Sequence, residues 1–466
     1  MGKSLFTIII SLSLVVSSQA QLKEELSIDE YLGYIKAFHP LVKQANIALS
    51  ESEAKLLKSR GAFDPKLSAD FNEKNFKGSN YYERLNATFS IPTYYGLTLN
   101  GQFSQAEGVL VNPENVVSGD QLYGVGASLN LAKGLLANER MTALKQAKSF
   151  VNQAREENAL QINEILFEAT KAYLDWYRAY REYEIYEGFI ANALFRFEGV
   201  RSRFEAGDLA EIDTTEARIA YQLRLLSQEK AALKLREKAL KASNFLWIGD
   251  TPVEITQGVI PSLNAEAYDL IFTVNEIVLE EHPKLKALGY KADIQKFERR
   301  LQRSNLLPEV TLDYQWLSET DPSQNFNLAL DPDNSTTKLK IAMPLFLRKE
   351  RAELRLAELK FQDVTLEQDQ VYLSLKNKID ALQTAVQSYS NQSELAESIV
   401  VDYTTLFSGE QQKFEAGESS LFLVNSRESK LIESTLKAIE IDMAQKAAQA
   451  EFYFNVNFPD LDPTTN

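Results

Sequence analysis

The feature that most constrains this sequence is a long, proline-free helical pattern between Asn138 and Gly207. Every seventh residue from Ile162 is apolar, as are companion positions three or four residues away. The two sets are Ile162, Ala169, Trp176, Tyr183, Ile190, Phe197, Phe204 and Leu166, Tyr173, Tyr180, Leu194. A seven-residue apolar repeat is typical of helices that wrap around one another. At roughly 1.5 Å per residue the rod extends for about 100 Å, so the sequence predicts a coiled-coil rod that needs partner helices.

The thirteen prolines show that the chain is duplicated. All of them fall outside the windows 114–251 and 345–458, which can therefore hold long helices, because proline breaks helix interiors. His39-Pro40 precedes a predicted helix to about Arg60, and 243 residues later His282-Pro283 precedes another to about Arg303. The tetrapeptide Phe-Glu-Ala-Gly at 204–207 recurs at 414–417. Such landmarks at a fixed offset indicate an internal repeat.

The duplication and the chain ends predict five segments. Residues 1–20 resemble a signal peptide, with Lys3 before an apolar core and Ser18-Gln19-Ala20 as the cleavage site. The others are a first repeat at 21–250, with short helices, strands and a helical hairpin whose tip lies near 203–211; a connector at 251–265; a second repeat at 266–458, with its tip near 413–421; and a polar tail at 459–466.

Between the short helices and the rods the apolar period changes from seven to two. The alternating segments are 67–71, 85–91, 97–103 and 123–131 in the first repeat, and 310–316 and 339–343 in the second. One apolar and one polar face suits a strand with lipid outside and water inside. An ordinary half-buried sheet explains each segment equally well.

A second rod is predicted from about Arg348 to Glu415, and each rod then reverses at a glycine and returns as a shorter helix. The first return helix carries Ile219, Leu226, Leu233, Leu240 and Trp247, and the second carries Val424, Leu431, Ala438 and Phe452. Gly207 and Gly417 suit the left-handed residue that ends many helices.

Composition excludes several classes of function. The net charge of −15 makes the chain a poor partner for nucleic acid, and the lack of cysteine excludes disulfides and thiol chemistry. Phosphate-loop, HExxH, GxSxG and dinucleotide motifs are all missing from the sequence. The only histidines, His39 and His282, precede prolines at helix starts, where a structural role is favoured. We therefore expect no enzyme activity, no cofactor and no metal site.

The order of these elements resembles the outer-membrane efflux protein family typified by TolC. The resemblance rests on the two His-Pro helix starts, the two Phe-Glu-Ala-Gly turns, Leu345-Phe346 between strand and rod, and Asp213 six residues past Gly207. It implies an α+β membrane protein built from a duplicated strand–long-helix-hairpin unit. Three copies would form a transmembrane β-barrel, continued by a periplasmic α-helical coiled-coil barrel.

The implied function is that of an outer-membrane exit duct in a tripartite efflux or type I secretion system. As a homotrimer in outer-membrane lipid, extending into the periplasm, it would passively conduct substrates delivered by an inner-membrane pump of the RND or ABC type. A periplasmic adaptor (membrane fusion) protein would meet its tips. The alternative is a secreted coiled-coil structural or adhesin protein, which explains the rods but not the duplicated strands. No motif identifies the substrate, the pump or the adaptor.

Two features depart from the family pattern. Members usually supply four strands per protomer, whereas six are predicted here, so either the barrel is larger or the hairpin around 91–96 lies outside the membrane. The type member also carries acidic gate residues six and nine positions past its second turn glycine, where this sequence has Leu423 and Ser426. The acidic gate of the type member is therefore not expected at these positions.

The candidate functional residues lie at the two tips. By resemblance, the positions that meet the adaptor are Arg203, Phe204, Gly207, Asp208, Leu209, Phe414, Gly417, Glu418 and Ser419. They would also occur in any well-formed helical turn. The predicted periplasmic-entrance acids are Glu205, Asp208, Asp213, Glu415 and Glu418. In a trimer, all but Asp213 would form a ring of carboxylates that favours cations and raises its own proton affinities; a solvated acidic surface is the alternative.

Overall fold

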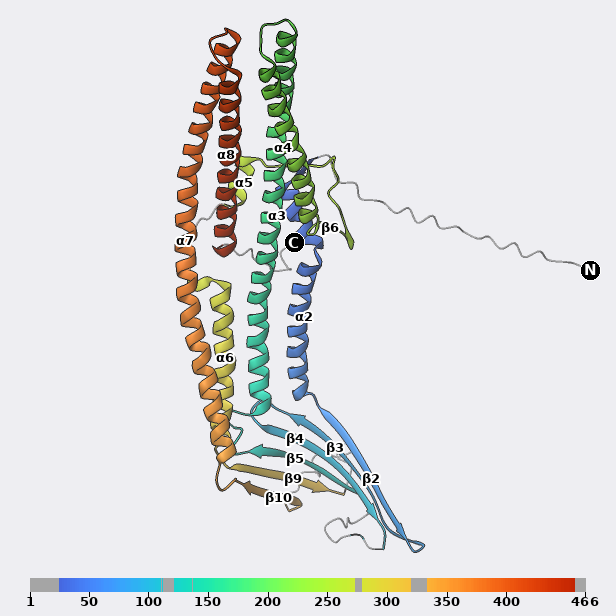
Figure 1. Cartoon of the computed structure of the whole chain (residues 1–466). Coiled ribbons are helices and arrows are strands. Elements are labelled where there is room, and N and C mark those ends of the chain that lie inside the picture. The colour runs from blue at the N-terminus through green and yellow to red at the C-terminus, as the bar shows by residue number, and fades with distance from the viewer. Residues whose placement is uncertain are drawn as a thin grey trace, which may run out of the picture. The chain divides into compact units, whose positions relative to one another are not determined.

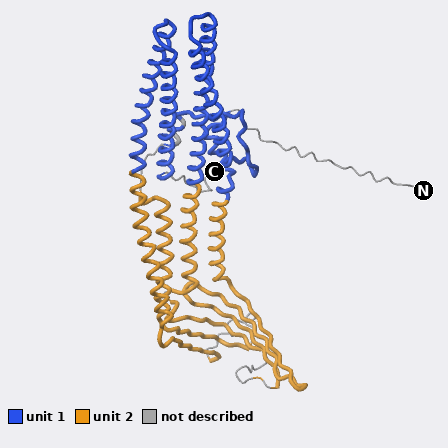
Figure 2. Tube along the Cα trace, in the orientation of Figure 1, with its two compact units in different colours: residues 1–43, 163–275, 381–457 blue, residues 44–162, 276–380, 458–466 orange. Residues whose placement is uncertain are grey.

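The structure is a computed structural model, and it describes residues 25–109, 111, 121–135, 137–272, 279–319 and 333–456. The predicted signal peptide and polar tail lie outside these residues, as does most of the loops at 113–120 and 321–337. The chain forms two compact units (Figure 2). Unit 1 comprises Met1–Lys43, Asn163–Asn275 and Ala381–Asn457; unit 2 comprises Gln44–Ile162, Glu276–Asp380 and Phe458–Asn466. Each unit draws on both halves of the chain, and the predicted repeat boundaries stay a prediction.

Long helices dominate the described residues (Figure 1). The helices are α1 (Ile28–Phe38), α2 (Pro40–Arg60), α3 (Glu139–Glu205), α4 (Glu211–Ser243), α5 (Ala265–Ile271), α6 (Pro283–Ser304), α7 (Arg348–Glu415) and α8 (Leu421–Val456), with short 3-10 turns at Gly61–Phe63 and Leu279–Glu281. Both predicted rods are confirmed, as α3 of 67 residues and α7 of 68 residues. The helices predicted after His39-Pro40 and His282-Pro283 are confirmed as α2 and α6.

The sequence prediction was wrong about Trp247, which is not part of the first return helix. Helix α4 ends at Ser243. The backbone N–H of each of the next three residues donates a hydrogen bond to the carbonyl three positions earlier, as in a 3-10 turn; for example, the Leu246 N–H donates to the Ser243 carbonyl at 3.0 Å. Trp247 then lies in β6 (Trp247–Ile248), which pairs with β7 (Thr251–Pro252). Gly249, at φ 63°, supplies the left-handed turn between these strands.

The predicted apolar seam of α3 is buried over part of its length, at Ile162, Ala169 and Trp176. Towards the tip it is less covered: Tyr183, Ile190 and Phe197 are half-buried and Phe204 is 38% exposed. Helix α4 behaves differently, because the residues that it buries are alanines: Ala217, Ala231, Ala239 and Ala242. Five of its large apolar residues repeat every seven positions and are each at least 40% exposed: Ile212, Ile219, Leu226, Leu233 and Leu240. We call these five residues the α4 stripe. A stripe of this kind on a single chain is a helix-packing face without a partner.

Unit 2 contains one antiparallel sheet of six strands (Figure 1). The strands are β2 (Lys66–Phe76), β3 (Ser79–Pro92), β4 (Leu97–Glu107), β5 (Gln121–Asn130), β9 (Glu309–Ser318) and β10 (Ser335–Ala342). Their order is β10-β9-β5-β4-β3-β2, so the β5–β9 pair joins the two halves of the chain. All six predicted strands are present, and the hairpin around 91–96 joins β3 and β4 within this sheet.

The strand registers align the apolar residues on one face of the sheet. Phe71 lies opposite Leu85, and Leu312 lies between Leu129 and Leu339. Because side chains alternate along a strand, the serine, threonine and asparagine residues between them share the other face. On the edge strands β2 and β10 the apolar face is open to solvent; Leu67 is 77% exposed and Ile341 67% exposed. The sheet therefore presents an apolar surface that no other described residue covers there.

The core of unit 1 forms around Tyr173 of α3. Its hydroxyl lies 2.6 Å from the Ser262 carbonyl oxygen and accepts a hydrogen bond from the Ser262 N–H at 3.0 Å. Ser262 belongs to β8 (Ile260–Ser262), which pairs in parallel with β1 (Glu25–Ser27). The rings of Tyr31 and Trp176 pack against Tyr173 at 5.2 and 5.5 Å. Burial raises the pKa of the Tyr31 and Tyr173 hydroxyls, so both act as neutral hydrogen-bonding groups.

The two histidines have the same structural role, as the sequence predicts. His39 Nδ1 accepts a hydrogen bond from the Leu41 N–H at 3.3 Å, and His282 Nδ1 accepts one from the Lys284 N–H at 3.1 Å. Each ring therefore caps a helix whose first residue is proline, which has no N–H of its own to satisfy.

Protonation of His39 is expected to destabilise the protein. Burial lowers its pKa below the ordinary value of about 6.5, and its ring stacks on Phe245. Between the lowered pKa of the folded state and about pH 6.5, the unfolded chain binds more protons at this position than the folded chain does. The stability that His39 contributes is therefore complete above about pH 6.5 and is lost as the pH falls towards the folded pKa. In His39→Asn, whose amide oxygen also caps but does not titrate, the thermal unfolding temperature should fall less between about pH 7 and 5.5 than in the wild type. Identical pH profiles by circular dichroism would contradict this role.

Candidate functional site

The first tip, between α3 and α4, is a tight turn set by backbone hydrogen bonds. The Gly207 N–H donates to the Phe204 carbonyl at 2.9 Å, and the Asp208 N–H donates to the Arg203 carbonyl at 2.8 Å. This pair of bonds defines a Schellman motif, which requires a left-handed residue, and Gly207 has φ 84°.

The second tip, between α7 and α8, repeats this geometry 210 residues later. The Gly417 N–H donates to the Phe414 carbonyl at 3.1 Å, the Glu418 N–H donates to the Lys413 carbonyl at 2.8 Å, and Gly417 has φ 77°. The repeated tetrapeptide therefore encodes a backbone conformation. The role of both glycines in the turn is conformational, because no side chain of theirs is available for contact.

An apolar cluster in unit 1 joins the two hairpins close to these turns. Val200 of α3, Ala217 of α4 and Leu421 of α8 are buried, and Phe197, Leu209 and Phe414 pack against them. Leu209 and Phe414, both predicted to contact an adaptor, therefore serve at least in part to hold the hairpins together. Leu421 was not singled out from the sequence.

Some of the remaining tip residues are exposed, and one of them is held by a hydrogen bond within the hairpin. Arg203, Asp208 and Glu418 are exposed, and Phe204 is 38% exposed. The Ser419 hydroxyl donates to the Glu410 carboxylate, which links the start of α8 back to α7. The surface available to a partner at the tips thus combines one aromatic ring with charged side chains.

The five predicted entrance acids have different surroundings. The Asp213 carboxylate accepts a hydrogen bond from the Ala210 N–H at 3.2 Å and so caps the start of α4. Glu205 lies 3.8 Å from Arg201, and Glu415 accepts a hydrogen bond from Gln411. Asp208 and Glu418, the remaining two, are exposed and form no ion pair with another described residue. Of the five acids, these two are the most accessible to a cation or to a basic side chain of another protein.

A buried ion triad, which sequence reasoning missed, lies further along the same helices. Glu428 of α8 is fully buried; its carboxylate lies 2.5 Å from Arg196 Nη2 of α3 and 3.4 Å from Arg224 Nη2 of α4. Arg224 also donates to the Ser429 hydroxyl at 2.9 Å. A glutamate on the predicted seam between Val424 and Leu431 was the available signal, since an acid at a packing position needs buried cations.

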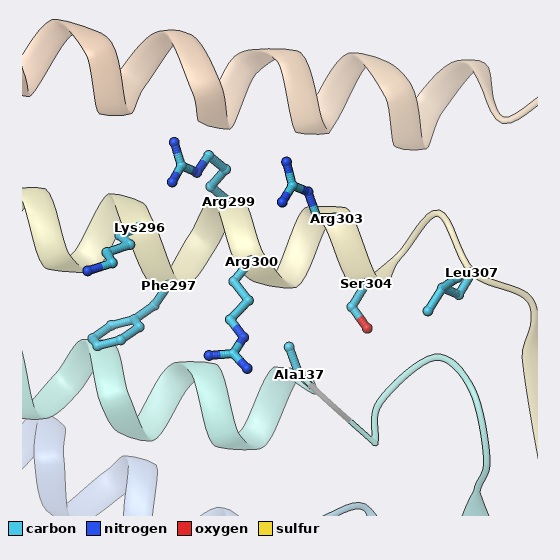
Figure 3. A pocket seen from close by; sticks show the side chains of 8 residues that line it. All are labelled: Ala137, Lys296, Phe297, Arg299, Arg300, Arg303, Ser304 and Leu307. Atoms are coloured by element: carbon cyan, nitrogen blue, oxygen red, sulfur yellow. The ribbon is translucent and has the colours of Figure 1, made fainter.

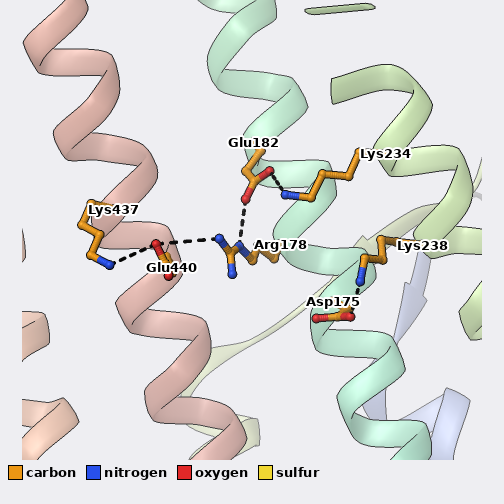
Figure 4. A network of polar contacts seen from close by, with 7 residues as sticks. All are labelled: Asp175, Arg178, Glu182, Lys234, Lys238, Lys437 and Glu440. Carbon is orange, nitrogen blue, oxygen red and sulfur yellow. Dashed lines mark hydrogen bonds and ion pairs between the residues drawn. The ribbon is translucent and has the colours of Figure 1, made fainter. Parts of the chain in front are cut away.

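A second polar network joins α3 to α4 and α8 (Figure 4). Glu182 of α3 lies 2.8 Å from Arg178 and 2.5 Å from Lys234 of α4. Arg178 in turn lies 3.9 Å from Glu440 of α8. These groups are more exposed than the Glu428 triad, so each pair contributes little stability by itself. The network shows which faces of the three helices meet.

The described residues contain no group of three or more His, Asp or Glu side chains arranged to hold a metal ion. Among those residues, no helix has both the length and the apolar character needed to cross a membrane.

Residues 275–454 match the sequence model of a family described as outer membrane efflux protein. Three similar solved structures are the Campylobacter jejuni CmeC outer membrane channel (TM-score 0.63, 13% identity, 92% of this chain and 85% of that chain), the Vibrio cholerae outer membrane protein VceC (0.64, 12%, 92% and 96%) and a membrane protein from Pseudomonas aeruginosa (0.65, 12%, 92% and 92%). At these identities the likeness shows the fold. No curated protein matches this sequence.

The tip glycines and a helical glycine should respond to alanine with opposite signs. No atom lies within 4 Å of a Cβ built on Gly207, Gly417 or Gly199, so only the backbone conformation differs. Gly207→Ala and Gly417→Ala should destabilise their turns by about 1 kcal/mol, because alanine is strained at positive φ. Gly199→Ala, inside α3, should stabilise by roughly 0.5–1 kcal/mol. Amide hydrogen exchange at the tips measures both effects, and protection unchanged by Gly207→Ala would contradict the assigned turn.

Neutralising the buried glutamate should be far more costly than neutralising an exposed one. Glu428→Gln leaves the Arg196 and Arg224 charges buried without a partner, so a loss of about 3–5 kcal/mol in unfolding free energy is expected. The control is Glu433→Gln, which removes an exposed pair with Lys430 at 2.8 Å and should cost less than about 1 kcal/mol. Equal losses in denaturant unfolding would show that the triad does not hold the helices.

Proposed function

We propose that the protein is the outer-membrane exit duct of a tripartite efflux or type I secretion system, on the premise that residues 275–454 match the outer membrane efflux protein model. Substrates delivered by an inner-membrane pump of the RND or ABC type pass through it without further energy input. The two-faced, six-stranded sheet is the observation that best supports this proposal, because a secreted coiled-coil scaffold has no use for it.

The sheet has the properties that an outer-membrane protein requires. Its strands are 8 to 14 residues long, against the ~9–11 residues that a tilted strand needs to cross a bilayer. Its apolar face is open on β2 and β10, where lipid would cover it. The outer edges of β2 and β10 pair with no other described strand. We propose that the sheets of three copies join at these edges and close into one transmembrane barrel.

The helices support association into a homotrimer. The α4 stripe is not covered by any other described residue, and in unit 1 helix α7 exposes Leu395, Val401 and Leu406. Helix α8 contacts α3 and α4 through Glu428, and neither the α4 stripe nor the exposed residues of α7 take part in this contact. We propose that the α4 stripe of one copy packs against the exposed residues of α7 in the next copy. Around a threefold axis the same heterologous interface would then cover both surfaces in all three copies.

The tips are proposed to meet a periplasmic adaptor. Arg203, Phe204, Asp208 and Glu418 would supply the contacts, while Gly207 and Gly417 set the turns. Glu205 and Glu415, with Asp208 and Glu418, would place carboxylates at the periplasmic entrance. An adaptor that binds the open arrangement of the tips more tightly than the closed one would shift the channel towards opening.

Conductance tests the channel itself. The purified protein in a planar bilayer should produce stepwise, cation-preferring currents, since acidic entrances attract cations. Asp208→Asn with Glu418→Gln should shift the reversal potential towards zero and leave the single-channel steps intact. Absence of any conductance step in repeated reconstitutions would contradict the duct. Conductance steps in the double variant with the same reversal potential as the wild type would contradict only the proposal that these acids set the cation preference.

Disulfide trapping tests the proposed trimer, because the chain has no cysteine of its own. Leu226 and Leu395 are both exposed, and they lie 19 and 22 residues from their tip glycines along the sequence. Leu226→Cys with Leu395→Cys should yield covalent trimers on oxidation.

The matched control is Leu226→Cys with Glu397→Cys. Position 397 is also exposed, but it lies about 200° around α7 from position 395, at roughly 100° per residue. Covalent trimers formed equally well by both pairs would contradict the proposed pairing of α4 with α7.

A further inference from the structure

A cavity of about 480 Å³ in unit 2 lies beside the C-terminal half of α6 (Figure 3). Its lining is strongly basic, with Lys296, Arg299, Arg300 and Arg303 all contributed by α6. Lys296, Arg300 and Ser304 are spaced four residues apart and so form one row on the helix surface. Arg300 and Ser304 project towards the start of α3, which Ala137 precedes by two residues, and Arg299 and Arg303 project towards α7.

The four cations of this cavity have no carboxylate partner in the part of the chain that the structure describes. None of them lies within ion-pairing distance of an acid among the described residues, although the chain has 65 acidic and 50 basic side chains. The acid next to them on α6, Glu298, accepts hydrogen bonds from Gln146 and Gln302 instead. Arg299 lies over the ring of Phe361 at 4.5 Å, a contact that leaves its charge uncompensated. Positive charge is therefore concentrated in an otherwise acidic protein.

A buried hydroxyl gives a second, independent indication of a ligand. Ser304 is only 7% exposed, and its Oγ has no hydrogen-bond partner among the described residues. Leaving a buried hydroxyl unsatisfied costs roughly 1–3 kcal/mol. Figure 3 shows that it projects from the same side of α6 as Arg300. A ligand oxygen in the cavity would satisfy both groups at once.

The end of a helix does not account for this arrangement. The C-terminal dipole favours cations in the last turn, which applies to Arg303 but weakens rapidly towards Lys296, eight residues before the end of α6. The helix dipole also does not supply a hydrogen-bond partner for the Ser304 hydroxyl. Phe297 and Leu307 supply apolar walls next to the charges, as in a site that binds a charged group attached to a less polar body.

We propose that this cavity binds a phosphate group. The Arg300 guanidinium and the Ser304 hydroxyl donate hydrogen bonds to its oxygens, and Lys296, Arg299 and Arg303 supply further positive potential. The headgroup of an anionic phospholipid and a free phosphate share this chemistry, and basic pockets of membrane proteins bind such headgroups. The site is independent of whether the chain conducts substrates, so it stands or falls separately from the exit duct.

Thermal unfolding of the full chain in neutral detergent tests the site. The probes are inorganic phosphate and monomeric dihexanoyl phosphatidylglycerol, with chloride at matched ionic strength and dihexanoyl phosphatidylcholine as comparators. A bound ligand raises the unfolding temperature in a saturable way. A shift with inorganic phosphate identifies a free-phosphate site, and a shift with phosphatidylglycerol alone identifies a headgroup site.

Two variants and a control decide the assignment. Arg300→Gln should weaken the apparent affinity roughly tenfold or more, since one charge-assisted hydrogen bond is lost. Ser304→Ala should keep or raise the unfolding temperature without ligand and should reduce the shift with ligand, so a folding defect cannot explain its effect. Arg218→Gln, an exposed cation of α4, should leave the shift unchanged. The site is refuted if neither probe exceeds its comparator, or if Arg300→Gln and Ser304→Ala retain the full shift.

Discussion

The α4 stripe is the constraint on which the structure depends. Its five large apolar residues repeat every seven positions and remain exposed, while the residues that the same helix buries completely are alanines. Burying such residues is worth roughly 1.5–3 kcal/mol each, so a chain that leaves them in water forgoes much of its available stability. The apolar face of the sheet presents the same problem in unit 2. Two different partners, other helices and lipid, would solve these two problems.

Interactions within unit 1 then fix how the two hairpins meet. Glu428 attracts one arginine from α3 and one from α4, so three helices converge on a single buried carboxylate. The apolar cluster of Val200, Ala217 and Leu421 joins the hairpins close to their turns. A buried charge tolerates few alternative packings, because any displacement leaves it unpaired. The apolar cluster, being non-directional, tolerates more, and this difference favours movement at the tips over movement at Glu428.

Local features were predictable from the sequence. Proline positions and the seven-residue repeat give the bounds of α3 and α7, the alternating segments give all six strands, and the repeated tetrapeptide gives both Schellman turns, because each depends on neighbouring residues only. Long-range features were not predictable. The seven-residue repeat does predict apolar faces that need partner helices, but it does not say that α4 exposes its seam while α3 buries part of its own. The burial of Glu428 and the unsatisfied Ser304 also depend on which helix faces which. Trp247 was misassigned because the seven-residue apolar repeat continues to this residue, whereas the α-helix ends at Ser243 in a 3-10 turn.

The mass of the detergent-extracted particle tests the central claim most directly. If the α4 stripe and the sheet edges require other copies, light scattering should give a protein mass about three times that of one chain, and replacing Leu226 and Leu233 by glutamate should reduce it, since buried charges disfavour the contact. A particle with the mass of a single chain, with or without these substitutions, would contradict the account.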